Sequence, residues 1–273
     1  MIYFNHYLLF SIPLALSLYF FGYKLAKRIT SQKHKKIAFV VMLICVFPGL
    51  IIPIISITII LKLQISADLT LLLSLEGVEL LPCFLAFPVA YLVTLKPMAE
   101  KIRWNIFSKY IIFICFMNII SCYLDNFLFP VEGRAKIKDL WHNNVCLQST
   151  EYTCSPASLA NILNYYGIKE TEKTLAKGCY TSCRGTYTHY LIRCARKYGM
   201  ECKVYATIKP EEIPIPSIIT VKYLDSVLHS VAALAKENDR LLIADPMSGK
   251  TFYTYQELQK RHFTGHVIHV LKK

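Results

Sequence analysis

The sequence lacks the glycine-rich loop ending in Gly-Lys-Ser/Thr with which many ATP-using proteins bind phosphate. Only 10 of its 273 residues are glycine, and Gly249-Lys250 is too isolated to form such a loop. Its cysteine spacing does not match a zinc site, because Cys179 and Cys183 are not followed by a Cys/His pair of similar spacing at the distance that zinc fingers use. No nucleic-acid-binding module is recognisable. The sequence therefore predicts no cofactor, no metal ion and no nucleic-acid partner.

Acidic residues are scarce, with 18 Asp and Glu against 31 Lys and Arg and a formal net charge of +13. A basic surface favours anionic lipid headgroups or an acidic substrate, and a plain solvated surface is the alternative. The hydrophobic content of 54% and the mean hydropathy of +0.38 are high for a soluble protein. Because the apolar excess lies before residue 130, we predict a membrane domain over residues 1–132 and an ordinary domain over residues 135–273.

Four apolar segments approach the roughly 20 residues that a membrane-spanning helix needs. They are residues 7–23, 37–61, 76–95 and 110–128. The first basic residue is Lys24, so the first segment indicates a retained anchor and not a cleaved signal peptide. Glu76 and Glu79 in the third segment are either functional intramembrane carboxylates or interface residues before a span that begins near Leu80. The predicted first half is a multi-pass α-helical membrane segment of about four spans.

Basic residues predict how these spans are oriented. They gather between the first and second spans and between the third and fourth, whereas the second loop has only Lys62. By the positive-inside rule the first and third loops are cytoplasmic, and both termini face outward. The expected localisation is a multi-pass protein of the bacterial cytoplasmic membrane, with lipid as a partner and the C-terminal domain on the extracytoplasmic side.

The second half of the sequence has a candidate nucleophile, a cysteine at the N-terminus of a predicted helix. Apolar residues at helical spacing predict a helix that ends near Gly167, and Pro156 fits its first turn. Cys154 therefore lies at the N-terminus, where the helix dipole lowers a thiol pKa and favours the nucleophilic thiolate. The alternative for a single cysteine is a small buried hydrophobe.

Three more residues make a catalytic arrangement with Cys154. Gln148 lies six residues upstream, where its amide can donate to an oxyanion beside the Cys154 backbone N–H. His229 opens an alternating run typical of a strand, and Asp245 ends the next predicted strand. A hairpin of these strands would place Asp245 beside His229 and fix the imidazole tautomer. Other histidines compete for the role of base: His142, His189, His262, His266 and His269.

The predicted elements of residues 135–273 indicate an α+β fold. Helices are expected over about 154–166, 171–178 and 186–198, and a short one over 255–261. Strands are expected over about 201–207, 217–224, 229–237, 240–245 and 266–272. A helical layer against an antiparallel sheet would leave the site in the cleft between them.

The stretch from Gln148 to Ala160 resembles the active-site motif of the bacteriocin-processing cysteine peptidases that cut double-glycine leaders. The downstream pattern fits as well, with His229, then Ala244-Asp245-Pro246, Gly249, Tyr255–Leu258 and Phe263-Thr264-Gly265. The resemblance covers about residues 140–273. It implies a papain-like fold with Cys154 as nucleophile, His229 as base, Asp245 as orienting carboxylate and Gln148 as oxyanion donor. It also implies a peptide substrate cleaved after paired glycines, and an export system as partner.

The sequence departs from that family at three positions near the site. Thr153 and Ser155 stand where Asp and Gly usually flank the nucleophile, and Phe263 stands where Trp is common. We expect these departures to affect substrate preference more than peptidase activity. The predicted function is a membrane-anchored cysteine endopeptidase acting after translocation. The alternatives are a non-cleaving leader-binding module of an export system, and another acyl transfer by the same site.

An oxidising exterior would also suit the extra cysteines of the second half. We hypothesise a disulfide between Cys179 and Cys183, or between one of them and Cys194 or Cys202.

Overall fold

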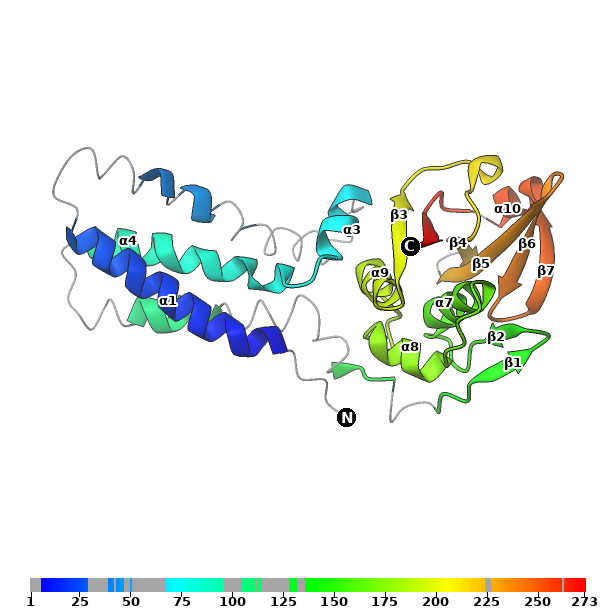
Figure 1. Cartoon of the computed structure of the whole chain (residues 1–273), viewed down its shortest axis with the longest axis horizontal. Helices are drawn as coiled ribbons and strands as arrows, with labels where there is room; N and C mark the ends of the chain where they lie inside the picture. Colours follow the sequence, from blue (N-terminus) through cyan, green and yellow to red (C-terminus); the bar gives the residue numbers. More distant parts are fainter. Residues whose placement is uncertain are drawn as a thin grey trace. The chain divides into compact units, whose positions relative to one another are not determined.

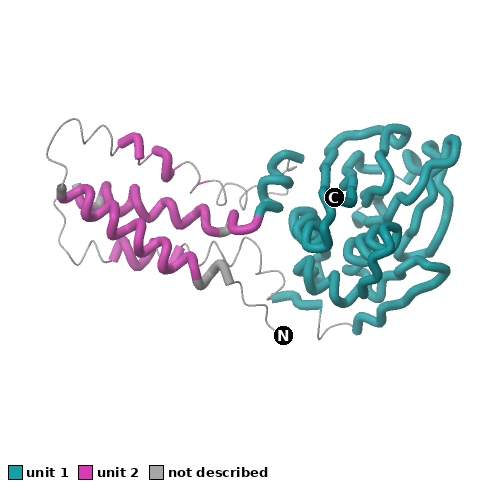
Figure 2. Tube along the Cα trace, in the orientation of Figure 1, with its two compact units in different colours: residues 1, 66–75, 125–273 teal, residues 2–65, 76–124 magenta. Residues whose placement is uncertain are grey.

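The computed structural model describes residues 6–28, 39–41, 43–46, 50, 67–95, 105–110, 112–113, 128–131, 136–223, 227–261 and 263–273. The chain forms two compact units (Figure 2). Unit 1 comprises residues 66–75 and 125–273 together with residue 1, and unit 2 comprises residues 2–65 and 76–124.

Unit 2 is built on two helices that pack through small residues. Helix α1 (His6–Arg28) lies against α4 (Ala86–Leu95), which follows the 3-10 helix η1 (Val78–Leu85). At Gly22 the backbones come so close that a Cβ would lie 2.7 Å from the carbonyl oxygen of Phe87. Glycine is therefore required there for the two helices to pack.

The prediction of four membrane spans is wrong. Among the described residues, no helix combines the length and apolar character needed to cross a membrane. Helix α1 contains Lys24, Lys27 and Arg28, so its apolar part falls short of about 20 residues. The predicted span over 76–95 is broken, because Gly77 is left-handed with φ 81° and Pro82 interrupts η1. Helix α4 has 10 residues and is only ~15 Å long.

The other two predicted spans, residues 37–61 and 110–128, lie mostly outside the described residues. The integral multi-pass localisation is therefore corrected together with the fold class of the first half. The lipid partner and the extracytoplasmic placement lose their basis, since both depended on those spans. Glu76 is exposed in the turn before η1.

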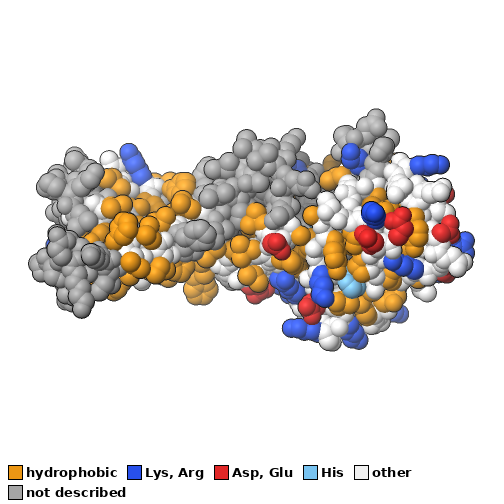
Figure 3. All heavy atoms as spheres, turned by 90° about the horizontal axis from the view of Figure 1, so that it is seen from above, with side chains coloured by type: hydrophobic (Ala, Val, Ile, Leu, Met, Phe, Trp, Pro, Cys, Tyr) orange, Lys and Arg blue, Asp and Glu red, His pale blue; other side chains and the backbone are white. Residues whose placement is uncertain are grey.

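Much of the apolar content of unit 2 lies on its surface. Apolar side chains gather on the face of unit 2 that Figure 3 shows. Exposed members include Phe10 at 63%, Phe21 at 56% and Leu92 at 50%. A pair of helices buries only one stripe of each, so the other apolar side chains of α1 and α4 stay exposed.

Unit 1 contains a six-stranded antiparallel sheet in the order β3-β8-β4-β5-β6-β7. The strands are β3 (Met200–Tyr205), β4 (Ser217–Tyr223), β5 (Val227–Glu237), β6 (Arg240–Asp245), β7 (Gly249–Thr254) and β8 (Val267–Lys272). A separate hairpin pairs β1 (Leu140–His142) with β2 (Val145–Leu147). The five predicted strands are present, whereas β7 and the β1–β2 hairpin were not predicted.

The sheet has a core on each face because neighbouring residues of a strand point to opposite sides. Ile218 of β4 joins the core beneath α7 (Cys154–Tyr165), α8 (Glu172–Gly178) and α9 (Thr188–Lys197) (Figure 1). Ile219, the next residue, joins the core on the other face, which includes Leu258 of α10 (Tyr255–Lys260). The four predicted helices are present, and the α+β papain-like architecture of the second half is confirmed.

A short helix from the first half of the sequence belongs to unit 1. Helix α3 (Ala67–Leu73) packs on α9 and β3. Arg193 donates to the carbonyl oxygens of Leu73 and Leu75, each at 2.7 Å, and Arg196 donates to that of Ser74 at 3.0 Å. These bonds satisfy carbonyl groups at the C-terminal end of α3 that a helix leaves without partners.

Acid is expected to destabilise unit 1 through His189, which is buried in α9 and stacked on Tyr187. Burial, followed by the charge of Arg193, lowers the pKa of His189 to about 3. In the unfolded chain the same group takes up a proton near pH 6.5. Its contribution to stability is therefore retained above pH 6.5 and lost as the pH falls towards 3. At pH 5 the loss from this group is roughly 2 kcal/mol.

Urea unfolding at pH 7 and pH 5 measures this loss. The variant His189→Phe keeps a ring at the position and has no group to protonate, so it should lose less stability than wild type. Replacing the exposed His142 with Phe is the matched control and should behave as wild type. Equal losses in all three proteins would contradict the assignment to His189.

Candidate active site

Cys154 is the first residue of α7, and the loop before it leaves the helix N-terminus open. The N-cap residue Thr153 makes no side-chain capping bond to the helix. Its hydroxyl instead donates to the carbonyl oxygen of Thr150 at 3.1 Å and accepts the N–H of Thr150 at 3.2 Å. The first-turn N–H groups and the positive end of the helix dipole therefore remain available beside the Cys154 sulfur.

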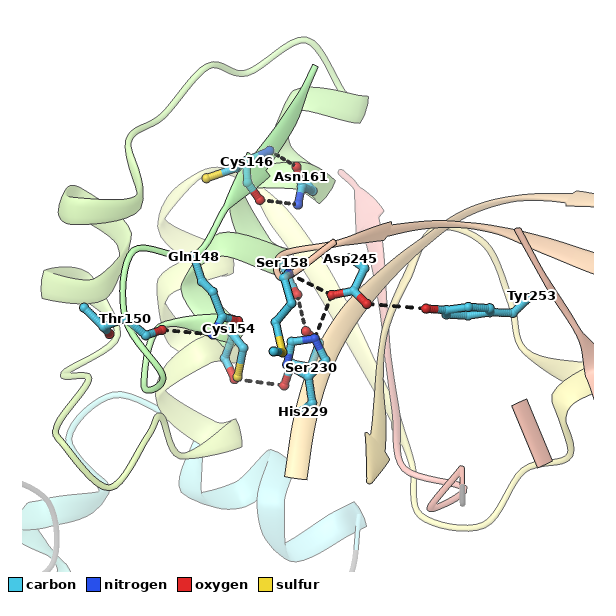
Figure 4. A network of polar contacts seen from close by, with 12 residues as sticks. Cys146, Gln148, Thr150, Cys154, Ser158, Asn161, His229, Ser230, Asp245 and Tyr253 are labelled. Carbon is cyan, nitrogen blue, oxygen red and sulfur yellow. Dashed lines mark hydrogen bonds and ion pairs between the residues drawn. The ribbon is translucent and has the colours of Figure 1, made fainter. Parts of the chain in front are cut away.

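His229 of β5 and Asp245 of β6 form a buried pair. His229 Nε2 lies 2.8 Å from Asp245 Oδ1, and the two residues are 5% and 4% exposed. Asp245 also accepts the backbone N–H of Met247 at 2.8 Å and the hydroxyl of Tyr253 at 3.4 Å. Figure 4 shows the carboxylate held between Tyr253 and His229. Because Nε2 is engaged, Nδ1 is the ring nitrogen left for the thiol of Cys154.

The pKa shifts of these groups favour a thiolate–imidazolium pair. Burial raises the pKa of Cys154, but hydrogen bonds from His229 and from the backbone N–H of Ser230 outweigh it and lower the pKa overall. Burial lowers the pKa of His229, whereas its hydrogen bonds to Asp245 and Cys154 raise it to about 9. Burial raises the pKa of the Asp245 carboxyl, but its hydrogen bonds to His229 and to the Met247 N–H, with the charge of His229, together outweigh burial and lower the pKa overall. Both shifts therefore favour a thiolate on Cys154 beside a protonated His229 ring.

Gln148 follows β2 and is connected to the Asp245 segment. Its backbone N–H donates to the carbonyl oxygen of Pro246 at 2.8 Å, and its Nε2 donates to that of Thr150 at 3.0 Å (Figure 4). The opposite amide orientation would place Oε1 against the Thr150 carbonyl, so the hydrogen bond fixes which atom is nitrogen. A side-chain amide carries two N–H donors, and the bond to Thr150 uses one of the two that Gln148 offers.

Two residues that the sequence did not single out hold the Gln148 loop. The fully buried Glu172 accepts the N–H of Ser149 at 2.8 Å and its hydroxyl at 2.5 Å. Asn161 of α7 accepts the N–H of Cys146 at 2.6 Å and donates to its carbonyl at 3.1 Å. Asn161 had a recognisable signal, since it is a polar residue within an apolar helix. Glu172 had none, because a Glu in a first helical turn is ordinary.

The other described histidines that competed for the role of base lie elsewhere in unit 1. His142 is exposed in β1 and contacts Asn143, and His189 is buried in α9. His266 lies just before β8, and His269 lies within it. His262 is outside the described residues. Among the described histidines, His229 is the one that hydrogen-bonds to Cys154.

The hypothesised disulfide is not formed. Cys179, Cys183, Cys194 and Cys202 are all free thiols. Cys183 donates to the carbonyl oxygen of Pro130 at 3.5 Å, while Cys179 and Cys194 share a hydrogen bond. Burial raises the pKa of Cys179 well above its ordinary value, so this thiol is protonated at neutral pH.

Comparison with known sequences places the similarity in the second half of the chain. Residues 142–273 match the Peptidase C39 family. An uncharacterized protein of Methanothermobacter thermautotrophicus is 30% identical over 124 residues, which are 45% of this chain and 85% of that protein. The lacticin-481/lactococcin-DR transport/processing ATP-binding protein of Lactococcus lactis subsp. lactis is 28% identical over 127 residues. That match covers 45% of this chain and 18% of the relative.

Solved structures resemble the same half. The peptidase domain of Streptococcus ComA, described as a bi-functional ABC transporter involved in quorum sensing, has 22% identity and a TM-score of 0.44. That match covers 48% of this chain and 100% of that domain. A double glycine motif protease from an AMS/PCAT transporter, solved with its leader peptide, has 27% identity and a TM-score of 0.42. That match covers 52% of this chain and 96% of that protease.

Proposed function

Residues 142–273 of this chain belong to the peptidase C39 family, and from this premise we propose that the chain is a cysteine endopeptidase. The observation that carries the proposal is the buried His229–Asp245 pair, hydrogen-bonded to Cys154 at the open N-terminus of α7. We assign the activity to the predicted second domain, residues 135–273. The proposed roles are nucleophile for Cys154, acid and base for His229, orienting carboxylate for Asp245 and oxyanion donor for Gln148.

The proposed reaction has two halves. The Cys154 thiolate attacks the carbonyl carbon of the scissile peptide bond, and the carbonyl oxygen becomes an oxyanion held by Gln148 Nε2 and the Cys154 backbone N–H. His229 gives its proton to the leaving amine as the C–N bond breaks, which leaves a thioester on Cys154. Neutral His229 then takes a proton from water as the water attacks the thioester. The carboxylic acid departs, and the thiolate–imidazolium pair is restored.

Asp245 keeps His229 in the orientation that both halves require. Its bond to Nε2 directs Nδ1 towards Cys154 and stabilises the imidazolium form. The Met247 N–H and the Tyr253 hydroxyl hold the carboxylate in turn. The imidazole therefore does not have to reorient between the acid and base steps.

The proposed substrate is the leader of an exported peptide, cut after paired glycines. The motif around Cys154 supports this proposal, as does the lacticin-481 relative, which is named for transport and processing. An export system is accordingly the proposed partner.

A cleavage assay on the full chain tests the substrate. The purified protein is incubated under reducing conditions with a synthetic peptide that carries a leader ending in Gly-Gly, and products are identified by mass spectrometry. We expect one cut directly after the second glycine. The matched peptide with Ala-Ala at those positions should be cut at least ~100-fold more slowly, because a close-fitting site has little room for added methyl groups.

Two other results would change the assignment. Equal cutting of both peptides would contradict the paired-glycine preference while leaving a cysteine peptidase. Binding of the Gly-Gly peptide without any product would instead support the non-cleaving leader-binding module.

A further inference from the structure

Two serine side chains join the segment that carries Cys154 to the segment that carries His229. Ser155 directly follows Cys154 in α7, and Ser230 directly follows His229 in β5. Their Oγ atoms lie 2.9 Å apart, and Ser155 is only 8% exposed. One hydrogen bond thus connects the immediate neighbours of two side chains that are far apart in the sequence.

The same two serines also contact the nucleophile. Ser155 Oγ lies 4.0 Å from the sulfur of Cys154, and the backbone N–H of Ser230 hydrogen-bonds to that sulfur. A hydroxyl has one proton to donate and can accept two hydrogen bonds. When Ser230 donates to Ser155, the proton of Ser155 is free to point at the sulfur. A donor in that place stabilises the thiolate more than the neutral thiol.

A third serine fixes the strand on the helix. Ser158, one turn further along α7 and fully buried, donates to the carbonyl oxygen of Ser230 at 2.8 Å. Apolar packing between α7 and β5 sets their separation, but it is not directional. Hydrogen bonds depend on angle as well as distance. The serines can therefore set the position of β5 along α7, and with it the direction of His229 towards Cys154.

We propose that Ser155 and Ser230 are positioning residues that hold the Cys154 thiolate against His229. This inference rests on the proposed function, because it requires Cys154 to be the nucleophile. The two serines act through Cys154 and His229, and no contact with substrate is assigned to them. Their loss should slow the chemical step and leave substrate binding unchanged.

The pH dependence of Cys154 alkylation tests this role without a peptide substrate. Iodoacetamide reacts with the full chain over a range of pH, and peptide mass spectrometry follows Cys154 alone. At pH 6 we expect Ser155→Ala and Ser230→Ala each to react about tenfold more slowly than wild type, with the midpoint shifted up by about one pH unit. The double variant should show less than the product of the two single effects, since one broken link disables both partners.

Matched variants separate positioning from packing. Ser230→Thr keeps a hydroxyl and should restore the wild-type profile. Thr186→Val removes one hydroxyl of the Thr181–Thr186 pair, whose Oγ1 atoms are 2.7 Å apart in the loop between α8 and α9, and should also match wild type. Melting temperatures identify variants that do not fold. If Ser155→Ala does not fold, Ser230→Ala is compared with Ser230→Thr instead.

Three results would overturn the proposal. The first is a pH profile of Cys154 alkylation that is unchanged in folded Ser155→Ala and Ser230→Ala while wild-type Cys154 reacts fast. This result would leave the peptidase assignment intact. The second is a Ser230→Thr variant as slow as Ser230→Ala, which would make the effect one of packing. The third is a wild-type Cys154 no more reactive than an ordinary thiol, in which case the proposed function fails too.

Discussion

Replacing Cys154 with alanine is expected to reduce cleavage of a double-glycine leader peptide by ~10⁴-fold or more. The proposed mechanism needs a covalent bond to the Cys154 sulfur, and alanine has no atom that can form it. Within the described part of unit 1, Cys154 is the cysteine that hydrogen-bonds to His229. Initial rates measured by product mass spectrometry, at equal enzyme concentrations and matched melting temperatures, check the loss.

Cys183→Ala is the matched control for this experiment. Cys183 is also a partly exposed thiol of unit 1, but its sulfur donates to the carbonyl oxygen of Pro130. Its removal should leave the cleavage rate within about twofold of wild type, because no step of the mechanism uses it. A Cys154→Ala protein that keeps a tenth or more of the wild-type rate would show that another group is the nucleophile.

The local placement of Cys154 was predictable because a few neighbouring residues determine it. Apolar spacing over Leu159 to Tyr166 indicates a helix, Pro156 fits only its first turn, and Cys154 then stands at the N-terminus. The placement of Asp245 beside His229 followed from the β5–β6 pairing, since consecutive strands with a short turn form a hairpin. Both inferences required only contacts between residues close in sequence.

The residues that hold the site together were less predictable, because their partners are distant in sequence. Glu172 supports the Gln148 loop across 23 positions, and the Ser155–Ser230 contact spans 75. No periodic pattern reports which polar side chains will meet across a helix and a sheet. The departure at Ser155 was visible as an unusual residue, but its hydrogen-bond partner was not.

The membrane prediction failed for a different physical reason. Averaged hydropathy measures apolar content over a window and ignores whether the backbone continues as one helix. Gly77 in the left-handed conformation and Pro82 within η1 break the segment 76–95, and a 10-residue helix remains. Single residues with special backbone preferences therefore outweighed an apolar composition that suggested a span.

Replacing His229 with glutamine should be nearly as damaging as losing Cys154, with an expected fall of ~10³–10⁴-fold in cleavage. Glutamine keeps an N–H donor for Asp245, so the buried carboxylate retains a partner and the protein should still fold. It has no proton to give to the leaving amine. It also supplies no positive charge to the thiolate, so burial then dominates and the pKa of Cys154 rises.

The pH profile separates the loss of the proton donor from the loss of the positive charge beside the thiolate. In wild type, activity should rise as the Cys154 thiol, with its lowered pKa, ionises, and fall as His229 loses its proton at about pH 9. Because the imidazolium is absent in His229→Gln, the decline near pH 9 should vanish, and alkylation of Cys154 should require a higher pH than in wild type.

Asp245→Asn gives the intermediate case. It keeps the His229 ring and removes the charge that raises the ring's pKa, so the alkaline decline should move below pH 9 and the rate should fall less than in His229→Gln. If activity of His229→Gln still declines at high pH as in wild type, another group causes that decline. His229 would then not be the acid and base of the reaction. We expect the alkaline decline to vanish in His229→Gln and to move to lower pH in Asp245→Asn. The two results together identify an imidazolium that a carboxylate stabilises, and either variant alone would not.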